Sequence, residues 1–146
     1  MSISRTVLII EDNKADYELL KEALERVKDI DLTLFYLPGG QEGLRFVNKT
    51  GEFSGSPTPD LIILDLNLPT ISGFEILKLI KNNPKLKSIP VIIYSTSTDQ
   101  QDINQSYDLQ ANSYVAKEYE IQSLFDKIAI LGNFWLKTAK IPERKE

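Results

Sequence analysis

Short runs of apolar residues alternate along the chain with longer segments in which apolar residues recur every three or four positions. Runs rich in Val, Ile and Leu, each ended abruptly by polar residues, are typical of strands buried on both faces of a sheet. The pattern predicts five strands, over residues 7–10, 32–37, 61–64, 91–94 and 113–116.

The segments between these strands carry the helical period. Helices are expected over residues 15–27, 42–48, 73–80, 100–109 and 121–135. In the second helix we expect Leu44 and Val47 to face inward, and Ser72 can cap the third. The last helix has an apolar stripe made of Ile121, Leu124, Phe125, Ile128, Leu131 and Trp135.

Regular alternation of buried strands and helices predicts an α/β fold with a parallel sheet and helices on both faces, a doubly wound architecture. The chain of 146 residues is sufficient for one domain. We expect a single domain over 1–146, with a core of about residues 5–136 and a C-terminal tail over 137–146. The Gly-, Ser- and Pro-rich stretch 51–59 is expected to be a loop inside this domain.

Composition excludes several classes of function. The sequence has no Cys and no His, so a disulfide, a thiolate or imidazole metal site and a Ser-His-Asp triad are impossible. A net charge of −4 without a basic run argues against nucleic-acid binding. No stretch approaches the roughly 20 apolar residues of a membrane helix, and the N-terminus lacks a signal-peptide core. We therefore expect a cytoplasmic protein that binds neither nucleic acid nor membrane.

Reactive side chains stand where the predicted strands end. Glu11 and Asp12 follow the first strand, Asp65 the third, Ser95 the fourth and Lys117 the fifth. The carboxyl ends of parallel strands share one edge of a sheet, so these groups should converge there. Three clustered carboxylates need a cation, and an all-oxygen donor set favours Mg²⁺.

A carboxylate nucleophile, a metal ion, a hydroxyl and an ammonium group are together the equipment for phosphoryl transfer to an aspartate. An isolated acid after a strand is more often a helix cap or a solvated loop residue. Five such groups at four strand ends are hard to explain in that way. The sequence therefore predicts that Asp65 accepts a phosphoryl group.

The same segments resemble the receiver domain of two-component response regulators. The resemblance rests on Glu11-Asp12-Asn13, Asp65-Leu66-Asn67-Leu68-Pro69 with Gly73, residues 90–95, and Ser113-Tyr114-Val115-Ala116-Lys117, and it spans about residues 5–136. It implies a flavodoxin-like (βα)5 fold with strand order 2-1-3-4-5. It also implies a phosphoacceptor that is not a turnover enzyme.

The resemblance assigns a role to each matching residue. Asp65 matches the phosphorylated aspartate, and Lys117 matches the lysine that contacts the phosphoryl group. Three residues match metal-binding positions: Asp12 as a direct Mg²⁺ ligand, Glu11 as the second acid, and Asn67 through its backbone carbonyl.

Two further matches concern signalling. Ser95 matches the hydroxyl that moves onto the phosphoryl group, and Tyr114 matches the aromatic switch that turns inward afterwards. One position departs from the family, because Glu118 stands where proline usually follows the lysine, often after a cis bond. That departure leaves the aim of Lys117 open.

A finer resemblance is to the small response regulators of cyanobacterial phytochromes. It rests on the loop 51–60, on residues 106–112 and on Phe134-Trp135-Leu136. It implies a phytochrome histidine kinase as phosphodonor, a homodimer, and signalling by protein contact without an effector domain. Phe134 and Leu136 flank the stripe of the last helix, so they form an interface or pack back onto the core.

Three alternatives remain. A degenerate receiver would act as a binding module without phosphorylation. A phosphatase of the haloacid dehalogenase type would usually carry its nucleophile after the first strand and a second Asp where Asn67 stands. A flavin-binding protein would need a hydroxyl- and Gly-rich loop after the first strand, where Glu11 and Asp12 would repel a phosphate.

Overall fold

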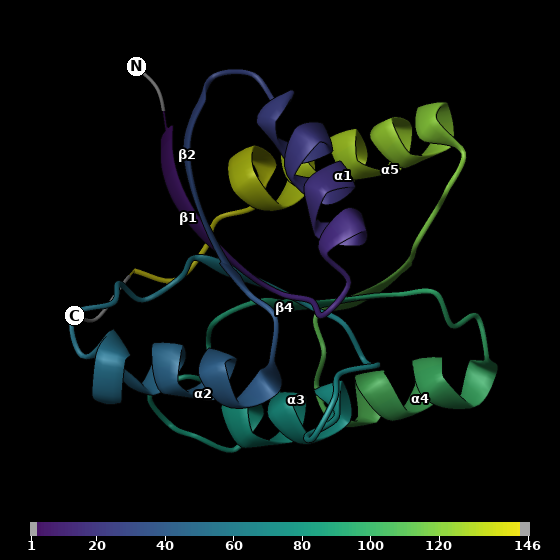
Figure 1. Cartoon of the computed structure of the whole chain (residues 1–146). Helices are drawn as coiled ribbons and strands as arrows, with labels where there is room; N and C mark the ends of the chain where they lie inside the picture. Colours follow the sequence, from purple (N-terminus) through teal and green to yellow (C-terminus); the bar gives the residue numbers. More distant parts are fainter. Residues whose placement is uncertain (1–2, 144–146) are drawn as a thin grey trace.

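The computed structural model describes residues 3–143, which form a five-stranded parallel sheet between two layers of helices (Figure 1). The strands are β1 (Ile3–Ile10), β2 (Ile30–Leu37), β3 (Leu61–Leu64), β4 (Val91–Ser95) and β5 (Ser113–Ala116). The helices are α1 (Lys14–Glu25), α2 (Gly40–Asn48), α3 (Gly73–Lys81), α4 (Gln100–Asp108) and α5 (Ile121–Asn133). A short 3₁₀ turn, η1 (Gly51–Phe53), interrupts the loop before β3, and a π-helical turn, η2 (Phe134–Thr138), follows α5.

The strand order is β2-β1-β3-β4-β5, and every neighbouring pair is parallel. Helices α1 and α5 cover one face of the sheet, and α2, α3 and α4 cover the other (Figure 1). The predicted doubly wound fold and its strand order are thus confirmed.

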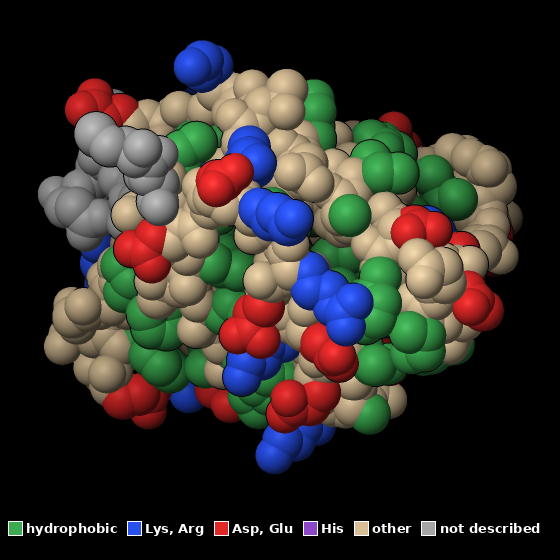
Figure 2. Space-filling view, turned by 90° about the horizontal axis from the view of Figure 1, so that it is seen from above, with side chains coloured by type: hydrophobic (Ala, Val, Ile, Leu, Met, Phe, Trp, Pro, Cys, Tyr) green, Lys and Arg blue, Asp and Glu red, His purple; other side chains and the backbone are tan. Residues whose placement is uncertain are grey.

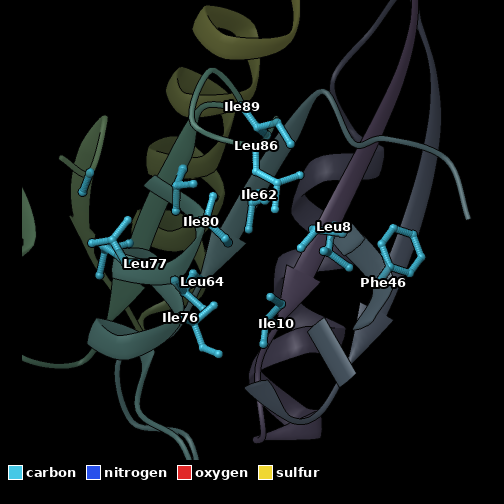
Figure 3. Packing of buried hydrophobic residues seen from close by; sticks show 14 of the residues in the cluster. Leu8, Ile10, Phe46, Ile62, Leu64, Ile76, Leu77, Ile80, Leu86 and Ile89 are labelled. Carbon is cyan, nitrogen blue, oxygen red and sulfur yellow. The ribbon is translucent and has the colours of Figure 1, made fainter. Parts of the chain in front are cut away.

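Alternate residues of each strand supply two separate cores, because successive side chains point to opposite faces. Leu8 and Ile10 pack with α2 and α3, whereas Val7 and Ile9 pack with α1 and α5. Figure 3 shows the first core, which includes Leu64 of β3 and Ile76 of α3. These strand residues are completely buried, which explains their continuous apolar runs.

Several element boundaries differ from the sequence prediction. Strand β1 begins at Ile3 and includes the polar residues 4–6, because it pairs along its whole length with β2. Helix α2 begins at Gly40, and its buried large residues are Phe46 and Val47, while Leu44 is only half-buried against the same core. Edge pairing and the exact helix start depend on neighbours that a local pattern does not specify.

The end of α5 also departs from a regular helix. Ile121, expected on the inward stripe, is 48% exposed, and the buried large side chains are Leu124, Ile128, Leu131 and Leu136. The five-residue step from Leu131 to Leu136 corresponds to the wider π-helical turn of η2. Leu136 is therefore in the core, whereas Phe134 is 49% exposed. The expected tail over 137–146 is described only to residue 143; residues 144–146 lie outside the described part.

Candidate phosphoacceptor and metal site

Strand register brings the first acids together. Ile10 of β1 lies opposite Leu64 of β3, and the amide of Asp65 donates to the carbonyl of Ile10 at 3.0 Å. The next residue of each strand is an acid, so Glu11 and Asp65 emerge side by side. Carboxylate oxygens of Glu11, Asp12 and Asp65 lie within 4.8 Å of one another. Glu11 and Asp65 are buried, and Asp12 is exposed.

Lys117 reaches this cluster from the far side of β4. Its amide donates to the carbonyl of Ser95 at 2.8 Å, which fixes the backbone at the end of β5. Its Nζ lies 2.6 Å from Oε1 of Glu11 and 3.2 Å from Oδ2 of Asp65. A third carboxylate, Asp16 of α1, accepts from the same Nζ at 2.8 Å. The ammonium group is almost fully enclosed, with 3% of its side chain exposed.

The charged groups in this site alter one another's pKa. Burial and the neighbouring charge of Asp65 raise the pKa of Glu11 to about 8, although the hydrogen bond from Lys117 partly opposes the rise. Burial alone would lower the pKa of Lys117, but its hydrogen bonds to Asp16 and Glu11 and the charge of Asp65 raise that pKa above the usual range. Four carboxylates thus face one permanent cation, which leaves the cluster with excess negative charge that a dication can neutralise.

A glycine lets helix α3 approach the phosphoacceptor candidate. A Cβ at Gly73 would lie 2.2 Å from the carbonyl oxygen of Asp65 and 2.7 Å from the Cα of Leu66. The amide of Gly73 donates to the carbonyl of Leu66 at 3.0 Å. The turn after β3 is therefore packed directly against the start of α3, and only glycine fits at residue 73.

The two expected switch residues lie beside the site. Ser95 is completely buried, and its Oγ accepts from the amide of Ser97 at 3.2 Å. The hydroxyl of Tyr114 donates to the carbonyl of Ser97 at 2.8 Å. The amide of Tyr114 donates to the hydroxyl oxygen of Tyr107 at 3.1 Å. The loop after β4 thus connects Ser95 to Tyr114.

Comparison with known proteins agrees with this arrangement. Residues 7–129 match the model of the response regulator receiver domain. This chain belongs to the response regulator receiver family. Members of this family are signalling proteins rather than turnover enzymes.

Two similar proteins are response regulators from cyanobacteria. Response regulator Rcp1 of Synechocystis is 41% identical over 138 residues, which are 94% of this chain and 93% of Rcp1. The structure of the phosphorylated cyanobacterial phytochrome response regulator RcpA superposes with a TM-score of 0.91, at 39% identity over 96% of this chain and 99% of RcpA. The Mn²⁺-bound form of Rcp1 gives a TM-score of 0.90, at 40% identity over 95% of this chain and 99% of that one.

The receiver brings together most of the residues selected from the sequence. Glu11, Asp12, Asp65 and Lys117 form one cluster. Asn67 is adjacent, since its amide donates to Oδ1 of Asp65 at 3.2 Å. The proposed ligand role of its carbonyl stays a prediction, as do the roles of Ser95 and Tyr114.

Sequence reasoning missed Asp16 and Tyr119. Asp16 is buried in the first turn of α1, and its Oδ2 accepts from both Lys117 and the hydroxyl of Tyr119, the latter at 3.1 Å. A signal was present, because Asp16 precedes the buried Leu20 by four residues and Ala23 by seven. A carboxylate on the inward stripe of a helix requires a buried partner.

The sequence left the geometry after Lys117 open because Glu118 replaces the usual proline. None of the peptide bonds between residues 3 and 143 is cis, so the Lys117–Glu118 bond is trans. Within the same residues, no helix has the length and hydrophobicity needed to cross a membrane. Figure 2 shows acidic and basic side chains interspersed over the face covered by α1 and α5, without a continuous basic surface.

Proposed function

We propose that this receiver accepts a phosphoryl group on Asp65 from a histidine kinase, in a Mg²⁺-dependent reaction, and signals by contact with another protein. The observation that carries the proposal is the buried carboxylate of Asp65, which lies between an acidic cluster and the ammonium group of Lys117.

Mg²⁺ fits the donors at this site. Glu11, Asp12 and Asp65 provide hard carboxylate oxygens close enough to share one ion, and the carbonyl of Asn67 is a candidate fourth ligand. A related protein, Rcp1, has a Mn²⁺-bound structure. When bound, the cation would neutralise carboxylates and phosphoryl oxygens as they approach each other.

The reaction proposed for Asp65 is an in-line displacement. A carboxylate oxygen of Asp65 attacks the phosphorus of a phosphohistidine; a P–O bond forms as the P–N bond breaks, and the leaving imidazole keeps the electron pair. Lys117 donates hydrogen bonds to the equatorial oxygens. Hydrolysis of the acyl phosphate by water later returns Asp65 and inorganic phosphate, which ends the signal.

Ser95 and Tyr114 are proposed to respond to the phosphorylation of Asp65. Once Asp65 carries a phosphoryl group, the Ser95 hydroxyl gives up its contact with Ser97 and donates to a phosphoryl oxygen. The loop that holds the Tyr114 hydroxyl then shifts, and the α4–β5–α5 surface moves to a second conformation.

The proposed phosphodonor is a phytochrome photoreceptor kinase. The support is the similarity to Rcp1 and to RcpA, the second of which is described as a cyanobacterial phytochrome response regulator. The cytoplasmic location expected from the sequence stays a prediction.

Intact-mass spectrometry tests the function directly. The wild type, incubated with Mg²⁺ and either acetyl phosphate or an autophosphorylated phytochrome kinase, should gain one phosphoryl group. Asp65→Asn should gain none, and EDTA should prevent the gain. Asp31→Asn, an exposed carboxylate at the start of β2, is the matched control and should behave as the wild type. An equal gain in Asp65→Asn would overturn the proposal, and no gain in the wild type would favour a degenerate receiver.

We also propose that the chain forms a homodimer through α5. Ile130 is 74% exposed, and Phe134, one turn further along, is 49% exposed; together they form an apolar surface. The Ile130→Asp variant should sediment as a monomer at concentrations where the wild type sediments as a dimer. A wild type that is monomeric at all concentrations would overturn this proposal.

A further inference from the structure

Lys117 has three carboxylate partners, and one of them has no place in the reaction proposed above. Its Nζ contacts Glu11, Asp16 and Asp65, so each of its three N–H donors has an acceptor. Glu11 and Asp65 belong to the group of oxygens that could share a cation. Asp16 does not belong to that group.

This difference matters because the other two contacts must change during phosphoryl transfer. A cation would draw Glu11 and Asp65 toward itself, and Asp65 acquires a phosphoryl group. Asp16 keeps the same charge and the same covalent structure throughout. It is therefore the one carboxylate partner that can hold Lys117 in place before and after the transfer.

Asp16 is itself firmly placed. The side chain of Asn13 caps α1 by accepting from the amide of Asp16 at 3.0 Å. The buried residues Leu20 and Leu24 fix the helix against the sheet on the same face as Asp16. The hydroxyl of Tyr119 donates to Oδ2 of Asp16 at 3.1 Å, from the loop that follows Lys117.

We propose that Asp16, oriented by Tyr119, is a positioning residue that aims the ammonium group of Lys117 at the phosphoryl group on Asp65. This inference rests on the proposed phosphorylation of Asp65. Asp16 forms and breaks no bond in the transfer. It retains one N–H donor of Lys117, while the donors released by Glu11 and Asp65 become available to the phosphoryl oxygens.

The first test compares rates of phosphorylation of Asp65 by acetyl phosphate. Asp16→Asn keeps the size of the side chain but removes its charge. It should lower the maximal rate constant about tenfold, the expected cost of weakening a hydrogen bond between charged groups. The Mg²⁺ dissociation constant, measured by calorimetry, should change much less than it does in Asp65→Asn, because Asp16 adds charge to the cluster but is not in the group of oxygens that could share the ion. Asp31→Asn should match the wild type in both measurements.

The second test asks whether Asp16 acts through Lys117. In a Lys117→Met background, adding Asp16→Asn should cause no further loss of rate, since the group to be aimed is gone. An equal tenfold loss in that background would overturn the proposal. So would an unchanged rate in the single Asp16→Asn variant.

Tyr119→Phe provides a variant that does not disturb the buried charges. Its ring is exposed, so the fold should be retained, and the rate should fall about twofold because Asp16 loses one donor. That loss should disappear when Asp16→Asn is already present, and a persistent loss would count against the inferred link. If the wild type gains no phosphoryl group, the proposed function itself fails. If the wild type reacts and the Asp16→Asn variant reacts equally fast, only the positioning role of Asp16 fails.

Discussion

The ammonium group of Lys127 on α5 lies 2.9 Å from Oε1 of Glu118, and Glu118 directly follows Lys117 in the chain. The same Nζ donates to the carbonyl of Ala116 at 2.9 Å. The residues on both sides of Lys117 are thus tied to one side chain of α5. Glu118, which departs from the usual proline of the family, has a structural partner in this chain.

We expect unequal costs when the two members of this pair are changed. Glu118→Ala should lower the free energy of unfolding by about 0.5 kcal/mol, because the pair is partly exposed to solvent. Lys127→Met should cost about 1 to 2 kcal/mol, since it also leaves the Ala116 carbonyl without its donor. Urea unfolding measures both, and equal costs would contradict the double contact.

Gly73→Ala should damage both stability and phosphorylation. Its Cβ would overlap the backbone of Asp65 and Leu66, which cannot move without displacing the proposed phosphoacceptor. We expect a loss of about 1 to 3 kcal/mol in the free energy of unfolding and a slower reaction with acetyl phosphate. Gly55→Ala is the matched control, because nothing lies within 4 Å of its added Cβ. A Gly73→Ala variant as stable and reactive as Gly55→Ala would refute the packing argument.

Without Mg²⁺, the carboxylate of Asp65 should lower the free energy of unfolding, because it lies among other carboxylates. Asp65→Asn removes one of the clustered carboxylates, and its loss should bring the pKa of Glu11 down toward the ordinary value. In EDTA the variant should be about 1 kcal/mol more stable than the wild type. Mg²⁺ at about 100 times its dissociation constant should add about 2.7 kcal/mol to the wild type and less to the variant. Thermal unfolding with and without Mg²⁺ decides the matter; equal gains would show that Asp65 is not a ligand.

Lys81 should give the stability a dependence on alkaline pH. Its buried Nζ donates to the carbonyls of Lys87 and Ile89 and to Oδ1 of Asn112, at 3.0, 2.8 and 3.0 Å. Burial lowers the pKa of Lys81 to about 8 from its ordinary value of 10.5. Between these two values the unfolded chain binds the proton more strongly than the folded chain, so this lysine makes stability rise with pH.

The measurement is the difference in unfolding free energy between the wild type and Lys81→Met. That difference should increase by up to about 3 kcal/mol as pH rises from below 8 to above 10. Lys78→Met, on the exposed side of the same helix, should show no such increase. A difference that is flat or falls with pH would mean that the hydrogen bonds hold the proton on Lys81.

Because of the π-helical turn, substitutions of Leu136 and Phe134 should have very different effects on the free energy of unfolding. Leu136→Ala should cost about 2 to 5 kcal/mol, because Leu136 is completely buried. Phe134→Ala should cost about 0.5 kcal/mol or less at protein concentrations too low for association. Denaturant titration of the two variants compares them, and similar costs would contradict the register of η2.

Much of the fold follows from local pattern. The apolar run 61–64 that ends in Asp65 has a strong, simple signal, since all four of its residues are buried and a strand buried on both faces is continuously apolar. The convergence of Glu11, Asp65 and Lys117 then follows from parallel topology alone. At the end of the last helix the local pattern left both Phe134 and Leu136 undecided between an interface and the core. Leu136 is buried and Phe134 is 49% exposed, because a π turn widens the helical period there.

Asp16 was missed for a different reason. An acid in the first turn of a helix is normally explained by the helix dipole, and that explanation hides its second contact. Its partner Lys117 is separated by 101 positions, and no periodicity connects them. Only the position of Asp16 on the inward stripe with Leu20 pointed to a buried role.

The late position of Lys117 in the chain has a consequence for biosynthesis. A nascent chain that has emerged only through β4 contains Glu11, Asp12, Asp16 and Asp65 but not the lysine that balances them. Those acids cannot be enclosed together without their cation, because buried like charges repel and resist desolvation. The carboxyl edge of the sheet should therefore stay hydrated on the ribosome until β5 is added, and the last strand to be synthesised then closes the site.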